Sequence, residues 1–226
     1  MPQTPPVSSL IAHAFSIAMT KYNAELTQMT NLSGRMASRC LIPFASMDIQ
    51  RQSHLDLLLR CMEDEQAVRT AADAEDNILT FHYQSMFSET WIGGWYEILR
   101  AIRQRADEAL ARGDKTSGLE ASDEFKSLLI DFELLRIPLE KYEIAKDRSL
   151  KAPLLMTRYP LNNDESDDHV YDRQDPKREY HMPKGVSPRG SVMWLAIDHR
   201  SDDQYWIERR SLGDRLLALA NHPTMK

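Results

Sequence analysis

Apolar residues recur at alternating steps of three and four positions through the middle of the chain, from Asn77 to Arg112. This spacing places them on one stripe of a long helix, where they can pack against other elements. The stripe consists of Ile78, Phe81, Ser85, Ser88, Ile92, Trp95, Leu99, Ile102 and Ala106, and it is widened by Phe87, Trp91 and Ile98. Its width predicts that this segment is the central helix of a bundle.

Two adjacent glycines, Gly93 and Gly94, lie inside this helical pattern. Together they cost about 2 kcal/mol relative to alanines in a helix interior, so they require a reason. The sequence favours the close approach of another backbone beside Trp91 and Trp95. The alternative is a hinge or a π-bulge that lines a pocket.

Three further segments have the helical period, and they run from about 8 to 33, from about 48 to 62 and from about 122 to 142. Ser8, Ser9 and Ser122 are suitable N-caps for two of them. Pro138 should kink the last helix or make a new one begin at Arg136. With the central helix, these segments predict an antiparallel bundle of about four helices over residues 8–151.

The regular pattern stops between Ala152 and Gly190. This span holds several prolines, an acidic run and scattered aromatic residues, with no sustained period of either kind. A segment of this length without secondary structure is unusual inside a compact domain. Because its aromatic residues and methionines can anchor it, we expect an irregular but ordered arm over residues 152–190, laid across the bundle or a partner.

A β-hairpin and a short helix are predicted after the arm, over residues 191–226. The strands are Ser191–Asp198 and Gln204–Arg209, separated by turn residues, and the helix is Leu212–Ala220. Both faces of the first strand are apolar, which requires cover on each side. The fold class is therefore mainly α, with the hairpin and the terminal helix packed on the bundle.

The composition narrows the range of partners. The formal charge of −6 and the pI of about 5.7 give no overall attraction to nucleic acid or to an anionic membrane. The two cysteines, Cys40 and Cys61, fit buried thiols of a reducing compartment. The N-terminal residues form a poor signal peptide and the apolar runs are too short to span a membrane, so the expected location is the cytoplasm.

Sequence motifs of several common enzyme classes are missing from the chain. It has no glycine-rich phosphate loop, no GxSxG, no HExxH and no CxxC. No glutamate is followed three residues later by histidine, as a di-iron bundle requires. These observations favour a non-enzymatic protein without a cofactor.

The acidic cluster from Asp164 to Asp172 includes His169 and offers ligands for a hard metal ion, zinc or iron. It lacks the glycine and the terminal glutamate of an EF-hand. We therefore favour a solvated acidic turn that pairs with Arg173, Lys177 and Arg178, and we expect no metal. A metal-dependent hydrolase built on this cluster is the weaker alternative.

His82 and Glu89 are expected on the buried side of the central helix. A buried pair of this kind can act as a general base. The favoured interpretation is structural, since buried polar side chains normally satisfy one another.

Two arginines are each followed, six or seven positions later, by a residue with a ring. Arg215 is followed, after six intervening residues, by His222, and Arg136 leads in the same way to Tyr142, not to a histidine. The predicted bundle resembles the HEPN superfamily, whose active members are metal-independent ribonucleases with such an Arg–His motif. The resemblance implies an alternative function, a nuclease-like bundle that acts on RNA and presents Arg136, Lys141, Arg148 and Lys151 to phosphate.

The function that the sequence favours is protein interaction, by self-association or with a protein partner, with the arm and the hairpin as the contact surface. Tryptophan and arginine are the residue types that dominate binding hot spots. The expected contact residues are Arg136, Lys141, Arg158, Arg173, Trp194, Trp206 and Arg209. Nucleic acid is a possible partner that the sequence does not favour, and no membrane contact is expected.

Overall fold

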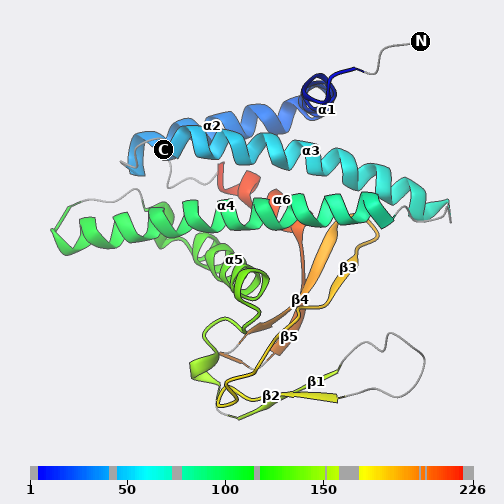
Figure 1. The fold of residues 1–226 in the computed structure, drawn as a ribbon. Coiled ribbons are helices and arrows are strands. Elements are labelled where there is room, and N and C mark those ends of the chain that lie inside the picture. The colour runs from blue at the N-terminus through cyan, green and yellow to red at the C-terminus, as the bar shows by residue number, and fades with distance from the viewer. Residues whose placement is uncertain are drawn as a thin grey trace.

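The fold was established from a computed structural model. The structure describes residues 5–40, 45–72, 78–114, 118–150, 152–157, 168–198, 200–201 and 203–220. In these residues it contains six α-helices, two short 3₁₀ helices and five strands (Figure 1). The helices pack antiparallel, and a small antiparallel sheet precedes the last helix, which confirms the predicted fold class. Within the described ranges, no helix is both long and apolar enough to cross a bilayer.

The helices are α1 (Val7–Lys21), α2 (Asn23–Cys40), α3 (Ala45–Ala71), α4 (Ile78–Ala111), α5 (Asp123–Lys141) and α6 (Arg209–Ala220). The strands are β1 (Leu154–Thr157), β2 (Asp168–Tyr171), β3 (Lys184–Val186), β4 (Val192–Asp198) and β5 (Asp203–Glu208). Figure 1 shows α2, α3 and α4 as roughly parallel rods, with α5 and the sheet on the far side of α4 from α3.

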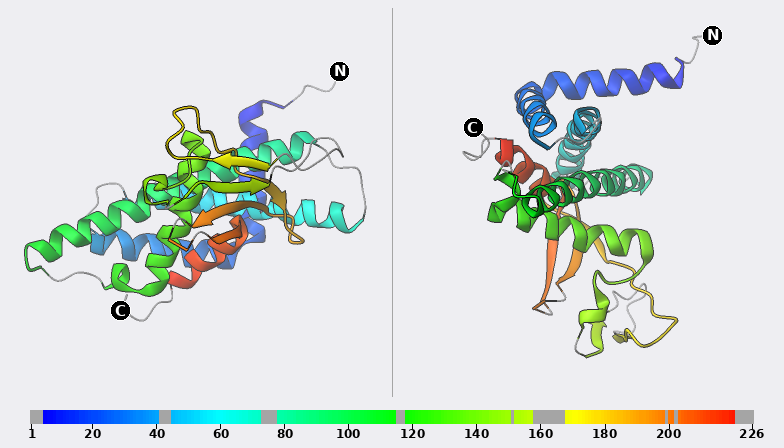
Figure 2. Two further views of the ribbon diagram at one scale, coloured as in Figure 1. Left: turned by 90° about the horizontal axis from the view of Figure 1, so that it is seen from below. Right: turned by 90° about the vertical axis from the view of Figure 1, so that its left-hand side faces the viewer.

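The prediction of one helix over residues 8–33 is wrong, because the chain turns between α1 and α2 at Tyr22. This residue has φ −110° and ψ 42°, outside the helical region. Its ring is buried in a small apolar cluster with Ala18, Leu57 and Cys61, which joins α1 to α3. Figure 2 shows the result: α1 crosses α3, and its N-terminal half projects beyond α3.

The central helix was predicted well. In α4 the residues at the predicted spacing are buried from Ser85 to Ala106, and Trp91 and Trp95 are fully buried. The stripe fails only at its start, where Ile78 is 78% exposed because the first turns of α4 extend past the core. The helix runs through Gly93 and Gly94 without a π-bulge.

The start of α5 also follows the sequence. Ser122 caps the helix, since its hydroxyl accepts a hydrogen bond from the Phe125 amide at 3.3 Å. The helix continues through Pro138 to Lys141, so no new helix begins at Arg136.

The arm is not irregular throughout, and the prediction is wrong at three strands. β1 and β2 pair antiparallel with Leu154 opposite Tyr171, and β3 pairs with β4. The side chains of Tyr171, Tyr180 and Met182 belong to the main core, so this part of the arm lies on the body of the protein. The strands are only three and four residues long, too short for a reliable alternation of apolar residues.

The predicted hairpin is confirmed as β4 and β5, with Trp194 opposite Ile207, and β4 is the central strand of the order β3-β4-β5. The two apolar faces of β4 differ in cover. Val192, Trp194 and Ala196 are fully buried toward the core, whereas Met193 and Leu195 on the other face are only half-buried. One continuous core includes Trp95 of the bundle, Trp194 of the sheet and Leu216 of α6.

Candidate functional site

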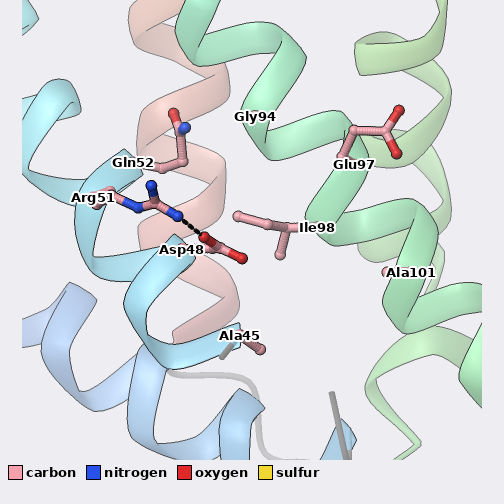
Figure 3. Close-up of a pocket in the computed structure, with 8 residues that line it drawn as sticks. All are labelled: Ala45, Asp48, Arg51, Gln52, Gly94, Glu97, Ile98 and Ala101. Carbon is pink, nitrogen blue, oxygen red and sulfur yellow. Dashed lines mark hydrogen bonds and ion pairs between the residues drawn. The ribbon is translucent and has the colours of Figure 1, made fainter. Parts of the chain in front are cut away.

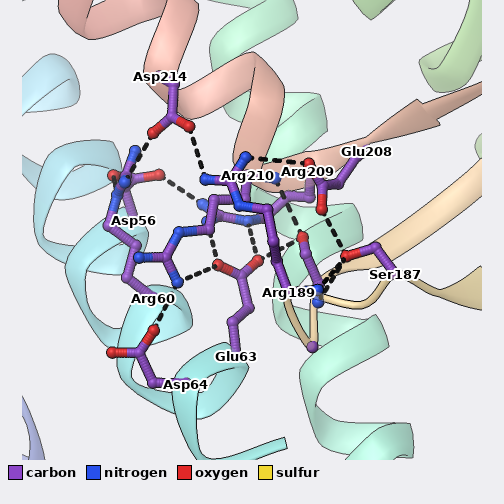
Figure 4. A network of polar contacts seen from close by, with 12 residues as sticks. Asp56, Arg60, Glu63, Asp64, Ser187, Arg189, Glu208, Arg209, Arg210 and Asp214 are labelled. Carbon is purple, nitrogen blue, oxygen red and sulfur yellow. Dashed lines mark hydrogen bonds and ion pairs between the residues drawn. The ribbon is translucent and has the colours of Figure 1, made fainter. Parts of the chain in front are cut away.

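A network of ion pairs joins α3, α6 and the β3–β4 turn (Figure 4). Its ionised members are five acids and five bases, namely Asp56, Glu63, Asp64, Glu208 and Asp214 with Lys21, Arg60, Arg189, Arg209 and Arg210. The charges therefore balance within the network. Such balance is required when charged groups leave water.

Arg209 lies at the centre and is fully buried. Its Nε and Nη2 donate to the two carboxylate oxygens of Glu63, each at 2.6 Å, and its Nη1 donates to Asp56. Its guanidinium also lies over the Trp91 ring, 5.0 Å from the ring centroid. The Ser191 hydroxyl donates to Glu63 at 2.6 Å, so the buried carboxylate has donors from both α6 and the β3–β4 turn. A bidentate pair of this geometry fixes the position of the first turn of α6.

The β3–β4 turn approaches α3 so closely that residue 190 must be glycine. A Cβ atom at Gly190 would overlap the carbonyl oxygen of Glu63 and lie 2.5 Å from the Ala67 amide nitrogen. The φ angle of +73° also disfavours any other residue there. The Gly190 carbonyl accepts a hydrogen bond from the Gln84 side chain at 2.7 Å, which connects the same turn to α4.

At the outer end of the network, Asp64 contacts three donors from different elements. Lys21 of α1, Tyr22 and Arg210 of α6 all lie within 2.6 Å of its carboxylate oxygens. Burial alone would raise the pKa of Asp64, but these hydrogen bonds outweigh burial and lower its pKa from 3.8 to about 2. Burial and the hydrogen bond to Asp64 raise the pKa of Tyr22 to about 12. Asp64 therefore stays ionised and helps to hold α1 and α2 on α3.

This lowered pKa predicts a loss of stability in acid. Because the pKa of Asp64 is lower in the folded than in the unfolded state, the unfolded state binds more protons as the pH falls from about 4 to about 2. Its stabilising contribution is complete above this range, and it is about 1 kcal/mol since the carboxylate is partly exposed. We expect Asp64→Asn to unfold more readily than the wild type in urea at pH 7, with a difference that shrinks as the pH falls below about 4 and vanishes only below about pH 2. A difference that stays constant over this range would contradict the assignment.

A pocket of about 330 Å³ lies between α3 and α4 beside Gly94 (Figure 3). Its lining residues are Ala45, Asp48, Arg51, Gln52, Gly94, Glu97, Ile98 and Ala101. A Cβ atom at Gly94 would overlap the side-chain amide of Gln52. The predicted close approach to the glycine pair is therefore made by a side chain and not by another backbone. Gly94 does line a pocket, but it does so within a regular helix and not at the hinge or π-bulge of the alternative.

Arg136 lies on the other side of α4, beside a second pocket of about 210 Å³ that is lined in part by Gly93. Its Nη2 is 2.8 Å from Glu140 and 3.4 Å from Glu97, and its guanidinium lies 5.2 Å from the centroid of the Tyr96 ring. A phosphate group would have to compete with these two carboxylates. These contacts do not test the prediction that Arg136 binds a partner.

The other predicted contact residues fall into two groups. Trp194 and Arg209 are fully buried in the core and in the ion-pair network, so the expectation that they form a contact surface is wrong. Lys141 and Arg173 are exposed, and Trp206 on β5 is 40% exposed. Arg158 lies outside the described residues. Both faces of β4 are apolar in sequence, so the sequence pattern could not show that the face bearing Trp194 is the one that the core covers.

His82 and Glu89 do not form a buried pair. The expectation for His82 is wrong, because its side chain is exposed and its ring lies against Tyr83. Glu89 is half-buried, accepts a hydrogen bond from Ser85 at 2.9 Å and forms an ion pair with Lys184 of β3. His82 belongs to the first turns of α4, where Ile78, Leu79 and Tyr83 are exposed as well.

The remaining candidates are tested only in part. Among the described residues, no three potential metal-ligating side chains gather at one point, and the acidic run from Asp164 to Asp167 lies outside them. Arg215 binds Glu124 and Asp131 at 2.6 and 2.5 Å, while His222 also lies outside. Cys61 is a buried free thiol, and burial raises its pKa.

Comparison of the chain with protein-family models, with curated proteins and with solved structures gives no match. The sequence reasoning missed the ion-pair network, although α3 carries a signal for it. Asp56, Arg60 and Glu63 recur at steps of four and three residues, which puts three charged side chains on one helix face. The same spacing is typical of a solvated helix face. It indicates a buried ion-pair network only once Arg209 is known to pack against this face.

Proposed function

We propose that this protein is a protein-interaction module that self-associates, and that α1 forms the contact with a second copy. The observation that carries this proposal is the exposed apolar surface of α1. Val7, Leu10, Ile11 and Ile17 are between 49% and 71% exposed. Of the residues in α1 only Ala18 is buried.

The exposed residues continue the face that α1 uses inside the chain. Val7, Ile11, Ala14 and Ala18 follow one another at steps of four and three residues, so they share one side of the helix. Ala18 packs on α3, while Val7 and Ile11 belong to the half of α1 that projects past α3 (Figure 2). From Val7 to Ile11, more than one turn of a packing surface is therefore left exposed in a single copy.

A second copy is the partner that the charge pattern favours. From Val7 to Thr20 the helix contains no lysine, arginine, aspartate or glutamate. Two such helices can pack face to face without burying an unpaired charge, and a two-fold contact uses the same surface on both copies. An amphipathic helix that binds an anionic membrane would instead carry lysine and arginine on its polar face.

The outer face of the sheet is a second place for contact. Met193 and Leu195 on this face are half-buried, and Trp206 lies opposite Leu195 on β5 with 40% of its surface exposed. The Leu195 amide donates to the Pro183 carbonyl, away from β5, so the backbone groups of Trp206 point outward from the sheet edge. An open edge beside an exposed tryptophan favours binding of another chain.

Sedimentation equilibrium tests both surfaces. We expect the wild type to dimerise with a Kd of roughly 10–100 µM. Ile11→Glu should weaken dimerisation about tenfold or more because it buries a charge at the contact. Ser9→Glu is the matched control, since it adds the same charge on the opposite side of the same turn. Trp206→Ala should keep the helical content and weaken association by about 2 kcal/mol if the sheet takes part.

The outcomes separate the alternatives. A wild type that stays monomeric at roughly 500 µM contradicts self-association altogether. If Ser9→Glu and Ile11→Glu weaken dimerisation equally, the effect comes from net charge and not from the apolar face. If only Trp206→Ala weakens it, the contact is the sheet and the assignment to α1 is wrong.

A further inference from the structure

The pocket between α3 and α4 contains a buried hydrogen-bond acceptor that the protein leaves unused. The Oε1 atom of Gln52 is buried and makes no hydrogen bond within the described part of the chain. Figure 3 shows the Gln52 side chain beside Gly94 at the pocket, with Asp48 and Arg51 on the same helix and Ile98 facing them from α4. A buried acceptor without a donor is unfavourable, so a bound molecule that donates a hydrogen bond would be stabilised there.

The glycine at position 94 makes room for the Gln52 amide at the pocket. Any side chain at Gly94 would overlap the Gln52 amide, whereas a Cβ atom at the neighbouring Gly93 would make an ordinary contact with Glu140 at 3.6 Å. Alanine would favour the helix at both positions. Helix packing therefore explains why residue 94 is glycine, but it does not explain why residue 93 is glycine.

The lining and the volume of the pocket limit the size and the polarity of a molecule that can bind there. Ala45, Ile98 and Ala101 provide an apolar part of the pocket wall. The volume of about 330 Å³ lies at the lower end of the range for small-molecule sites. The site therefore suits a compact and largely apolar body.

The rim of the pocket carries charges that are already paired. Asp48 forms an ion pair with Arg51. Glu97 binds Arg100 at 2.7 Å and Arg136 at 3.4 Å. A charged ligand would have to displace one of these partners, whereas a neutral ligand would not.

We propose that this pocket binds a small neutral organic molecule with an apolar body and one hydrogen-bond donor, which donates to Oε1 of Gln52. The proposal is independent of self-association, because the pocket lies between α3 and α4 and includes no residue of α1. The chemical class is that of a phenol, an indole or a small alcohol.

A titration followed by ¹H–¹⁵N correlation spectra tests the proposal with phenol as the probe. We expect saturable shifts of the Gly94 amide and of the Gln52 side-chain amide, with a Kd on the order of 1 mM. Anisole has the same ring without the donor, and it should bind about fivefold more weakly. Benzoate carries a negative charge, and it should give no saturable shift at these residues.

Two matched variants locate the site. Gly94→Ala should weaken phenol binding at least about tenfold, because the displaced Gln52 side chain fills the pocket. Gly93→Ala adds the same methyl group one residue away, and it should leave the Kd within about twofold. Circular dichroism and the melting temperature show that both variants are folded. Gln52→Met supplies a second test, since it should reduce the affinity for phenol to that for anisole.

Four results would overturn the proposal. A pocket that holds only water gives no saturable shift with phenol. Shifts confined to residues outside the pocket place the binding elsewhere. Equal affinities for phenol and anisole would show that no hydrogen bond to Gln52 contributes to binding. Equal losses of affinity in Gly93→Ala and Gly94→Ala would show that the packing of Gly94 against Gln52 does not control the site.

Discussion

Replacing Arg209 with methionine is expected to lower the free energy of unfolding by about 3–5 kcal/mol. The substitution keeps an unbranched side chain of similar length but leaves Asp56 and Glu63 buried without their shared cation. The loss is large because both carboxylates are fully buried, so water cannot replace the guanidinium. Urea unfolding followed by circular dichroism measures it.

Arg105→Met is the matched control for this experiment. Arg105 forms an ion pair with Glu108 on the exposed face of α4, where 55% of its side chain is accessible. Such a pair contributes about 0.5 kcal/mol or less. Equal effects of the two substitutions would show that the network around Arg209 is accessible to solvent. Replacing Glu63 together with Arg209 by apolar residues should recover part of the lost stability, because one acid and one base are then removed and Asp56 keeps its ion pair with Arg60.

Trp95→Ala is expected to cost about 3–5 kcal/mol, the typical loss when a large buried aromatic side chain leaves a cavity. Trp95 is fully buried in α4, and its ring meets that of Trp91 edge-on with the centroids 6.5 Å apart. Both rings belong to the core that joins the bundle and the sheet. We therefore expect the variant to be largely unfolded at 37 °C in a thermal melt.

The same helix offers a control for Trp95. Tyr83 is 49% exposed near the start of α4. Tyr83→Ala should change the free energy of unfolding by less than about 1 kcal/mol, since no buried cavity forms. A loss below about 1 kcal/mol in Trp95→Ala would contradict the central position of this side chain in the core.

Local patterns predicted the elements whose cause is local. The burial of α4 from Ser85 to Ala106 follows from its spacing, and the start of α5 follows from the hydroxyl of Ser122. The β4–β5 hairpin was found because polar turn residues separate two runs with high strand propensity. Each of these features needs only residues within one or two turns of one another.

Features that depend on distant residues were missed. No glycine or proline marks the turn at Tyr22, which exists because its ring packs beside Leu57 and its hydroxyl contacts Asp64. Arg209 looks like a surface residue at the end of a strand, and its burial is decided by carboxylates 146 and 153 positions earlier. The pocket at Gly94 likewise depends on Gln52 from another helix. A spacing rule along one segment contains no information of this kind.

The long separation within the Arg209 network has a consequence for synthesis of the chain on the ribosome. Glu63 is made 146 residues before Arg209, which corresponds to roughly 10–30 s at ordinary rates of translation. During this interval Glu63 has no guanidinium to accompany it into the interior, and Asp56 has only Arg60 of its own helix. The nascent helices α1–α5 can collapse, but the face of α3 that bears Asp56 and Glu63 must stay hydrated until α6 has been added. A chain interrupted before residue 209 therefore differs from the finished protein by an exposed acidic face next to unburied apolar surface, which chaperones and proteases can recognise.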